Sequence, residues 1–170
     1  MEFNLPSQIV KDLSFGNEGR NKIMSGVNKL ASAVKSTLGA SGKCVIYEDA
    51  MGRPVITKDG VTVAESVVLM DPVENIGATL IKEAASNTVR EAGDGTTTAT
   101  VIAHALLTNI NEYKGEEKIR DIKRSIDQCL EEVTLYLDNT RIEVEGDMLQ
   151  QVAYISCNND EELGDKIGEA

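Results

Sequence analysis

The sequence predicts a mainly α-helical protein with one small β-hairpin. Apolar residues recur at three- and four-residue steps over several long stretches, which is the spacing of one face of an α-helix. One short region instead holds two runs rich in β-branched residues on either side of a polar turn. The chain has 170 residues, 41% of them hydrophobic and 4% aromatic, with no tryptophan. Its core must therefore be aliphatic and alanine-rich, as in packed helices.

The net charge of −11 is unevenly distributed along the chain. Residues 1–60 carry eight basic and six acidic side chains, whereas residues 61–170 carry nine basic and 22 acidic ones. Nucleic acid and anionic membranes both require a basic face, so neither is expected as a partner. A nucleotide site built from both parts could draw its positive groups from the first. No apolar run approaches the roughly 20 residues of a membrane span.

The three cysteines, Cys44, Cys129 and Cys157, are widely separated and lack metal-ligand spacing. Without a signal peptide, reduced thiols in the cytosol are the default, so we expect a cytoplasmic protein.

The first 60 residues predict an arm, a helix and the hairpin. Residues 1–17 are mixed and read as an arm or an early strand. A helix is predicted over 18–38, ending at Gly39. The hairpin strands are predicted at 44–47 and 54–57. Two strands alone are marginally stable, so this ribbon must pack on the helices or add to another sheet, such as that of a neighbouring subunit.

The remaining chain is predicted to be helical, with a shift in composition after residue 138. The predicted helices cover 61–70, 73–92, 96–113, 117–138, about 148–155, and Asp160 to the C-terminus.

Residues 91–100 form a glycine-rich corner between two of these helices. Gly93 is expected to end the first helix in a left-handed conformation, and Asp94 or Thr96 to cap the second. Unpaired backbone N–H groups beside three threonine hydroxyls suit a phosphate. Asp94 would be repelled by a phosphate unless a cation intervened, which indicates a Mg²⁺ ligand. The alternative is a simple turn that caps a threonine-rich helix.

Lys58-Asp59-Gly60, at the end of the second predicted strand, is a second candidate. The lysine can hold phosphate charge and the aspartate can orient a water, although such a triplet is most often only a turn. The loop after the first helix, Gly39 to Gly42, can either approach a ligand or simply end that helix. The only histidine, His104, has no second ligand nearby in sequence and is interpreted as a structural or surface residue.

Three segments in this order resemble one family. They are Thr37-Leu38-Gly39-Ala40-Ser41-Gly42-Lys43, Ile56-Thr57-Lys58-Asp59-Gly60-Val61, and Ala92-Gly93-Asp94-Gly95-Thr96-Thr97-Thr98-Ala99-Thr100. They resemble the nucleotide-binding segments of group I chaperonins, the GroEL-type ring ATPases. The resemblance runs from about residue 9 to residue 170, and several motifs in order are more specific than any one of them.

The resemblance implies a fold, a domain organisation and a set of site residues. Residues 1–138 would be the N-terminal half of an equatorial ATP-binding domain, a helical bundle with one hairpin, and 139–170 the start of an intermediate domain. Asp59 would be catalytic by positioning the attacking water, and Asp94 would bind Mg²⁺, with K⁺ as a further candidate cation. The residues expected to contact ATP are Thr37, Leu38, Gly39, Ala40, Lys58, Asp94, Gly95, Thr96, Thr97 and Thr98.

The implied function is the ATP-binding portion of a chaperonin subunit that folds client proteins in a ring, with other subunits and a co-chaperonin as partners. Family subunits are much longer, so the domains that bind unfolded clients and complete the ATPase site are missing here. The chain is therefore expected to be a piece or a truncated form that binds ATP weakly and turns it over little or not at all. The alternative is a non-catalytic module that associates with full-length rings. An unrelated ATPase or kinase is disfavoured because no P-loop motif is present.

The sequence also departs from the family pattern. Ala40-Ser41-Gly42-Lys43 stands where the family usually has Pro-Lys-Gly-Arg. Losing the proline frees the loop backbone, and losing a basic group weakens the attraction for nucleotide. Such drift indicates a divergent member.

Overall fold

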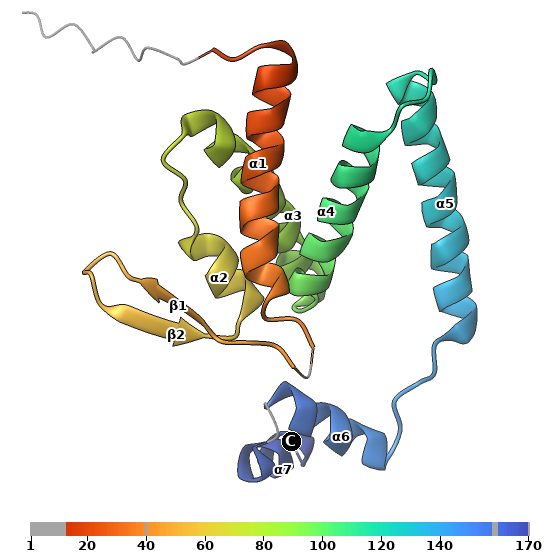
Figure 1. Cartoon of the computed structure of the whole chain (residues 1–170). Coiled ribbons are helices and arrows are strands. Elements are labelled where there is room, and N and C mark those ends of the chain that lie inside the picture. Colours follow the sequence, from red (N-terminus) through yellow and green to blue (C-terminus); the bar gives the residue numbers. More distant parts are fainter. Residues whose placement is uncertain (1–12, 40, 158–159, 170) are drawn as a thin grey trace, which may run out of the picture. The chain divides into compact units, whose positions relative to one another are not determined.

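A computed structural model describes residues 13–39, 41–157 and 160–169 (Figure 1). The chain divides into two compact units, Met1–Lys114 and Gly115–Ala170. The elements of the first unit are α1 (Gly16–Lys35), β1 (Val45–Glu48), β2 (Pro54–Thr57), α2 (Gly60–Ser66), α3 (Pro72–Ala92) and α4 (Thr96–Glu112). Those of the second are α5 (Ile119–Thr140), α6 (Asp147–Ser156) and α7 (Glu161–Gly168). The predicted mainly helical class with one hairpin is confirmed.

The first unit is built on a close crossing of α1 and α3. Gly26 of α1 and Gly77 of α3 are both buried where the two helices meet. A Cβ added to Gly26 would lie 1.8 Å from the carbonyl oxygen of Glu74, and one added to Gly77 would lie 2.0 Å from that of Ile23. Backbone therefore packs directly on backbone, an approach that only glycine permits.

Polar contacts fix the direction of this crossing. Glu74, in the first turn of α3, accepts a hydrogen bond from Ser25 at 2.8 Å and pairs with Lys29. Asp71 caps α3 by accepting from the N–H of Val73 at 2.8 Å, and its other oxygen lies 3.1 Å from Lys22 Nζ. The start of α3 is thus held against one face of α1.

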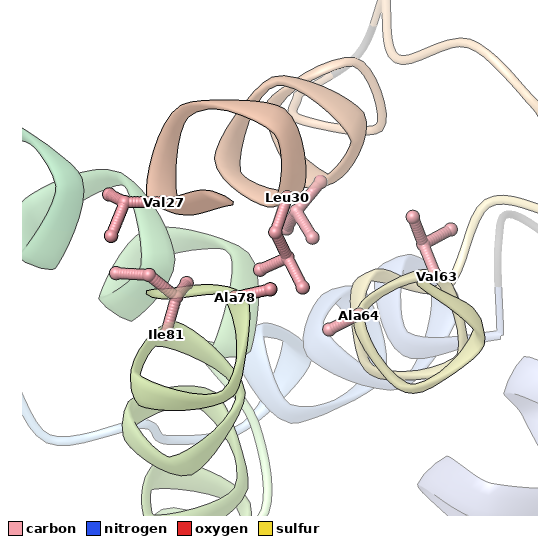
Figure 2. Close-up of a cluster of buried hydrophobic side chains, with 7 residues drawn as sticks. Val27, Leu30, Val63, Ala64, Ala78 and Ile81 are labelled. Atoms are coloured by element: carbon pink, nitrogen blue, oxygen red, sulfur yellow. The ribbon is translucent and has the colours of Figure 1, made fainter. Parts of the chain in front are cut away.

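The core forms where α2 packs against this pair of helices (Figure 2). Val27, Leu30 and Val34 of α1 are fully buried, as expected from their helical spacing. They meet apolar side chains of both other helices, namely Ala78 and Ile81 of α3 and Val63 and Ala64 of α2. The small side chains on α2 and α3 let three helices share one aliphatic core, which contains no aromatic ring.

The hairpin extends from this core as a two-stranded antiparallel ribbon (Figure 1). One face of the ribbon is half-buried, and Val45 on that face packs against the helical core. On the other face, the cross-strand partners Ile46 and Ile56 are 67% and 66% exposed. The tip is tight because the Asp49 carboxylate accepts from the backbone N–H groups of Met51 and Arg53.

Two helices end earlier than predicted. The periodic stripe predicts that α1 continues to residue 38, but it ends at Lys35, after which the backbone N–H groups of Thr37 and Leu38 bond to carbonyls only three residues back. The helix predicted over 61–70 ends at Ser66, with the chain extended at Val67. The predicted arm or strand falls largely on residues 1–12, outside the described residues.

The second unit comprises α5 and the pair α6–α7. None of the α5 residues is buried. The α6 and α7 helices pack on each other, and a Cβ added to Gly164 would lie 2.3 Å from the ring of Tyr154. The two compact units divide after Lys114, whereas the predicted boundary between the equatorial and intermediate domains lies after residue 138. That domain boundary stays a prediction. Across the part of the chain that the structure describes, no helix has the length and apolarity needed to cross a membrane.

We predict that Gly26→Ala lowers the free energy of unfolding by at least about 2 kcal/mol, because the new methyl group forces the α1 and α3 backbones apart. Alanine normally stabilises a helix interior by about 1 kcal/mol relative to glycine, so a loss reverses the usual sign. Urea denaturation followed by circular dichroism measures it. Ser32→Ala, at an exposed position of α1, is the control and should change stability by less than about 0.5 kcal/mol. Equal stability of both variants would refute the close crossing.

Candidate functional site

The corner between α3 and α4 turns on two glycines. Gly93 ends α3 in the left-handed conformation, at φ 77°, as predicted, and its N–H donates to the carbonyl of Val89 at 2.9 Å. The predicted capping of α4 by Asp94 or Thr96 is wrong, since Gly95 at φ 85° is the N-cap residue. The carboxylate of Asp94 turns back locally and accepts from the N–H of Gly95 at 2.6 Å. No side chain caps α4.

The first turn of α4 is therefore open to an outside acceptor. A helix leaves its first N–H groups without intrahelical partners, and here no side-chain oxygen replaces them. The hydroxyl-bearing side chains lie at different depths: Thr96 is buried, Thr97 half-buried and Thr98 exposed. Thr100, one turn further on, is fully buried, and its hydroxyl has no hydrogen-bond partner among the described residues. The exposed part of the turn is thus a cluster of donors.

Asp59 begins the second part of the site. As N-cap of α2 it accepts from the N–H of Thr62 at 2.8 Å and from the Thr62 hydroxyl at 2.5 Å, with a longer contact of 3.4 Å to Val61 N–H. Partial burial raises the pKa of Asp59, but the hydrogen bonds from Thr62 and Val61 outweigh it and hold the pKa below its usual value. Asp59 is therefore an oriented carboxylate that is ionised at neutral pH.

The structure brings these two parts together. A Cβ built on Gly60, the first residue of α2, would lie 2.2 Å from Thr97 Oγ1 and 3.6 Å from Thr96 Oγ1. The N-termini of α2 and α4 therefore meet, although they are some 36 residues apart in sequence. Lys58, just before Asp59, is exposed and makes no ion pair among the described residues. The segment of Lys58 and Asp59 therefore leads directly into the point where α2 meets the first turn of α4.

The loop after α1 is tight, and its hydrogen bonds described below are made within the loop and to α1. Gly42 N–H donates to the carbonyl of Gly39 at 2.9 Å, and Gly39 has φ 76°. The Thr37 hydroxyl donates to the Val34 carbonyl, and the Leu38 side chain is 48% exposed. Ala40 lies outside the described residues. No hydrogen bond joins this loop to the α2 or α4 N-termini within the described part of the chain.

These residues fit a phosphate with one Mg²⁺. At Gly60 the backbone of α2 lies directly against the Thr97 hydroxyl, and Asp94 has an oxygen, Oδ2, with no hydrogen bond among the described residues. No cluster of three or more His, Cys, Asp or Glu side chains suited to a metal ion occurs among those residues. Mg²⁺ commonly uses one or two carboxylates plus substrate phosphates, so a single Asp94 is compatible with it.

Sequence reasoning missed two contributors. Gly60 resembles an ordinary turn residue in the sequence, because its contact with the distant Thr97 leaves no local signal. Thr62 carries no prediction, although an aspartate directly before a helix commonly accepts from the backbone N–H three residues later, as Asp59 does here.

A sequence model of the TCP-1/cpn60 chaperonin family matches residues 30–170. The chain belongs to the TCP-1/cpn60 chaperonin family. The resemblance to chaperonins is thereby confirmed at the level of the family.

Solved chaperonin structures share this fold. The chaperonin gp146 from bacteriophage EL 2 (Pseudomonas aeruginosa), crystallised in the presence of ATP-BeFx, matches in two crystal forms with a TM-score of 0.78 and 33% identity, over 91% of this chain and 28% of that one. A group III chaperonin in the open state matches with a TM-score of 0.74 and 25% identity, over 91% of this chain and 31% of that one. The chain spans less than a third of either chaperonin's length.

We predict that Asp59→Ala lowers the free energy of unfolding by about 1 kcal/mol, since α2 loses its cap. Asp59→Asn is the matched control: asparagine caps almost as well, so at pH 7 this variant should lose only the ionic contribution and remain more stable than the alanine variant. Because the folded pKa of Asp59 lies below the ordinary value of about 3.9, its ionic contribution exists above that pH and is lost on further acidification. Urea titrations at several pH values measure both effects. Unchanged stability of the alanine variant would contradict the capping role.

Proposed function

We propose that this chain is the ATP-binding portion of a chaperonin subunit, of the GroEL-type group I. The observation that supports this most is the meeting of the α2 and α4 N-termini at Gly60 and Thr97. It gathers Lys58 and Asp59 beside the uncapped first turn of α4. The crystallisation of a related phage chaperonin in the presence of ATP-BeFx agrees with a nucleotide as ligand.

The phosphates would be held mainly by backbone. The N–H groups of Thr96, Thr97 and Thr98 and the partial positive charge of a helix N-terminus attract an anion. The left-handed Gly95 leaves the approach to these groups free of a Cβ. Lys58, two residues before Gly60, would add a full positive charge.

Asp94 would hold Mg²⁺ through its second oxygen while Gly95 N–H fixes its first. The bound ion supplies charge neutralisation between phosphates and carboxylate. K⁺ remains a further candidate cation without an assigned residue.

Asp59 would orient the attacking water. Its low pKa keeps it ionised, and the bonds from Thr62 hold the carboxylate in one orientation. It is thus a hydrogen-bond acceptor for a water placed between it and the phosphates.

Thr37, Leu38, Gly39 and Ala40 would line the rest of the nucleotide. Because the Thr37 hydroxyl already bonds to the Val34 carbonyl, this loop would contribute backbone groups and the exposed Leu38 side chain.

The proposed assembly is a cytoplasmic ring of chaperonin subunits that folds client proteins at the expense of ATP, with a co-chaperonin as a further partner. Residues 1–138 would belong to the equatorial domain and 139–170 to the intermediate domain. Client binding and the rest of the ATPase site would lie outside these 170 residues. The chain alone would therefore bind ATP weakly, with little or no turnover.

We predict that Asp94→Ala weakens Mg-ATP binding by about tenfold or more, since losing a metal ligand should cost at least as much as losing one of its outer partners. Isothermal titration calorimetry with and without Mg²⁺ measures it. Asp127→Ala, an exposed aspartate of α5 in the other compact unit, removes the same charge and should bind like the wild type. Equal loss in both variants, or binding by the wild type that does not need Mg²⁺, would contradict the proposed metal ligand.

A second candidate function is a non-catalytic module that associates with complete chaperonin rings. It is favoured by the exposed Ile46–Ile56 pair on a ribbon whose two outer strand edges are unpaired in the described sheet. Co-sedimentation with a full-length chaperonin distinguishes the two. If the chain is a module, the Ile46→Asp variant should no longer associate with rings, whereas the Asp94→Ala variant should still do so. If the chain is a nucleotide-binding portion, Asp94→Ala should weaken Mg-ATP binding as described above.

A further inference from the structure

The only histidine of the sequence joins α1 to α4. The half-buried His104 ring of α4 lies between two α1 side chains, with Nδ1 2.7 Å from Lys35 Nζ and Nε2 2.9 Å from Asn28 Oδ1. Asn28 and Lys35 are seven residues apart, which places them two turns apart on one face of α1. A single ring therefore spans two turns of the neighbouring helix.

The partners dictate the protonation state of this ring. A lysine ammonium has donors and no lone pair, so Nδ1 must accept the hydrogen bond. Nε2 then carries the proton and donates to the Asn28 carbonyl oxygen. The arrangement requires a neutral imidazole, because a second proton on Nδ1 would point at the Lys35 ammonium.

Lys35 is the charged group that acts on His104. The α2 and α3 helices also pack against α4, but none of their described charged side chains contributes to the shift of the ring. Burial lowers the pKa of His104, and the charge of Lys35 lowers it further. Among the residues that the structure describes, no carboxylate affects the pKa of this ring, so none offsets the charge of an added proton.

The contact of His104 with Lys35 and Asn28, here called the link, joins the two helices that carry parts of the proposed site: the loop after α1 and the first turn of α4. Lys35 is the last residue of α1, directly before the loop of Thr37, Leu38 and Gly39. His104 stands seven residues after Thr97 on α4, about 10 Å along the helix axis. An increase in the distance between α1 and α4 at this contact would therefore also move that loop relative to the first turn of α4.

We propose that His104 is a proton-sensitive positioning residue that holds α1 against α4 when neutral and loosens the nucleotide site when protonated. The nucleotide half of this inference rests on the proposed function. The folded state binds the proton less readily than the unfolded chain. The contribution of the link is therefore complete above the unfolded pKa of about 6.5 and declines as the pH falls below it.

Two substitutions test the link. In His104→Gln, the amide oxygen can accept from Lys35 and the amide NH₂ can donate to Asn28, but nothing titrates. His104→Arg places a permanent charge beside Lys35. We expect the wild type to lose several-fold more Mg-ADP affinity than the glutamine variant when the pH falls from 7.5 to a value at which ¹⁵N NMR shows the folded ring to be protonated, with affinity measured by calorimetry at both pH values. The arginine variant should bind several-fold more weakly than the other two at pH 7.5.

Titration of the nucleotide phosphates affects all versions equally, so the difference between wild type and His104→Gln isolates the ring. Melting temperatures at both pH values test the link without nucleotide, and the wild type should lose more on acidification than the glutamine variant. Equal losses in affinity or in melting temperature would overturn the proposal, as would ¹⁵N NMR shifts placing a proton on Nδ1 at pH 7.5. If no version binds nucleotide at pH 7.5, the proposed function fails, and the melting and NMR results alone decide the link between α1 and α4.

Discussion

The direct packing of the α1 and α3 backbones at Gly26 and Gly77 is the constraint on which the first compact unit depends. Neither glycine has room for a Cβ, since each would place one within about 2 Å of a carbonyl oxygen of the facing helix. The crossing brings the apolar stripes of both helices into register with α2, which closes the aliphatic core. Without aromatic side chains to fill space, such a core needs its helices close together.

The proposed site follows from this packing. The core fixes α2, so the residue before it, Asp59, is fixed as well. The glycine corner at the end of α3 sends α4 back against α1 and α3, which brings Thr97 to Gly60. Asp59 thereby has one observed role and one proposed role: its oxygens cap α2, and its ionised carboxylate would orient a water beside the proposed phosphate position. The surroundings that lower its pKa are the same ones that hold it in place.

Much of this arrangement was predictable because it is local. Gly93 between two periodic stripes predicts a helix end, and alternating β-branched runs predict the ribbon. The cap of α4 was not predictable, because Asp94 could bond either to the helix start or to its neighbour, and the left-handed Gly95 decides for the neighbour. The meetings of Gly26 with Glu74 and of His104 with Lys35 join distant segments, which leave no periodic signal in the sequence. The family resemblance implies the proposed site residues, but it does not imply these contacts.

Amide hydrogen exchange tests the central claim most directly, namely that the packed N-termini of α2 and α4 together hold a phosphate. With saturating Mg-ATP, the account predicts slower exchange at Thr96, Thr97 and Thr98, whose N–H groups have no intrahelical acceptor. It predicts no such change without Mg²⁺, and none in α6 or α7 of the second unit. Nucleotide binding that leaves the exchange of these three amides unchanged would contradict it.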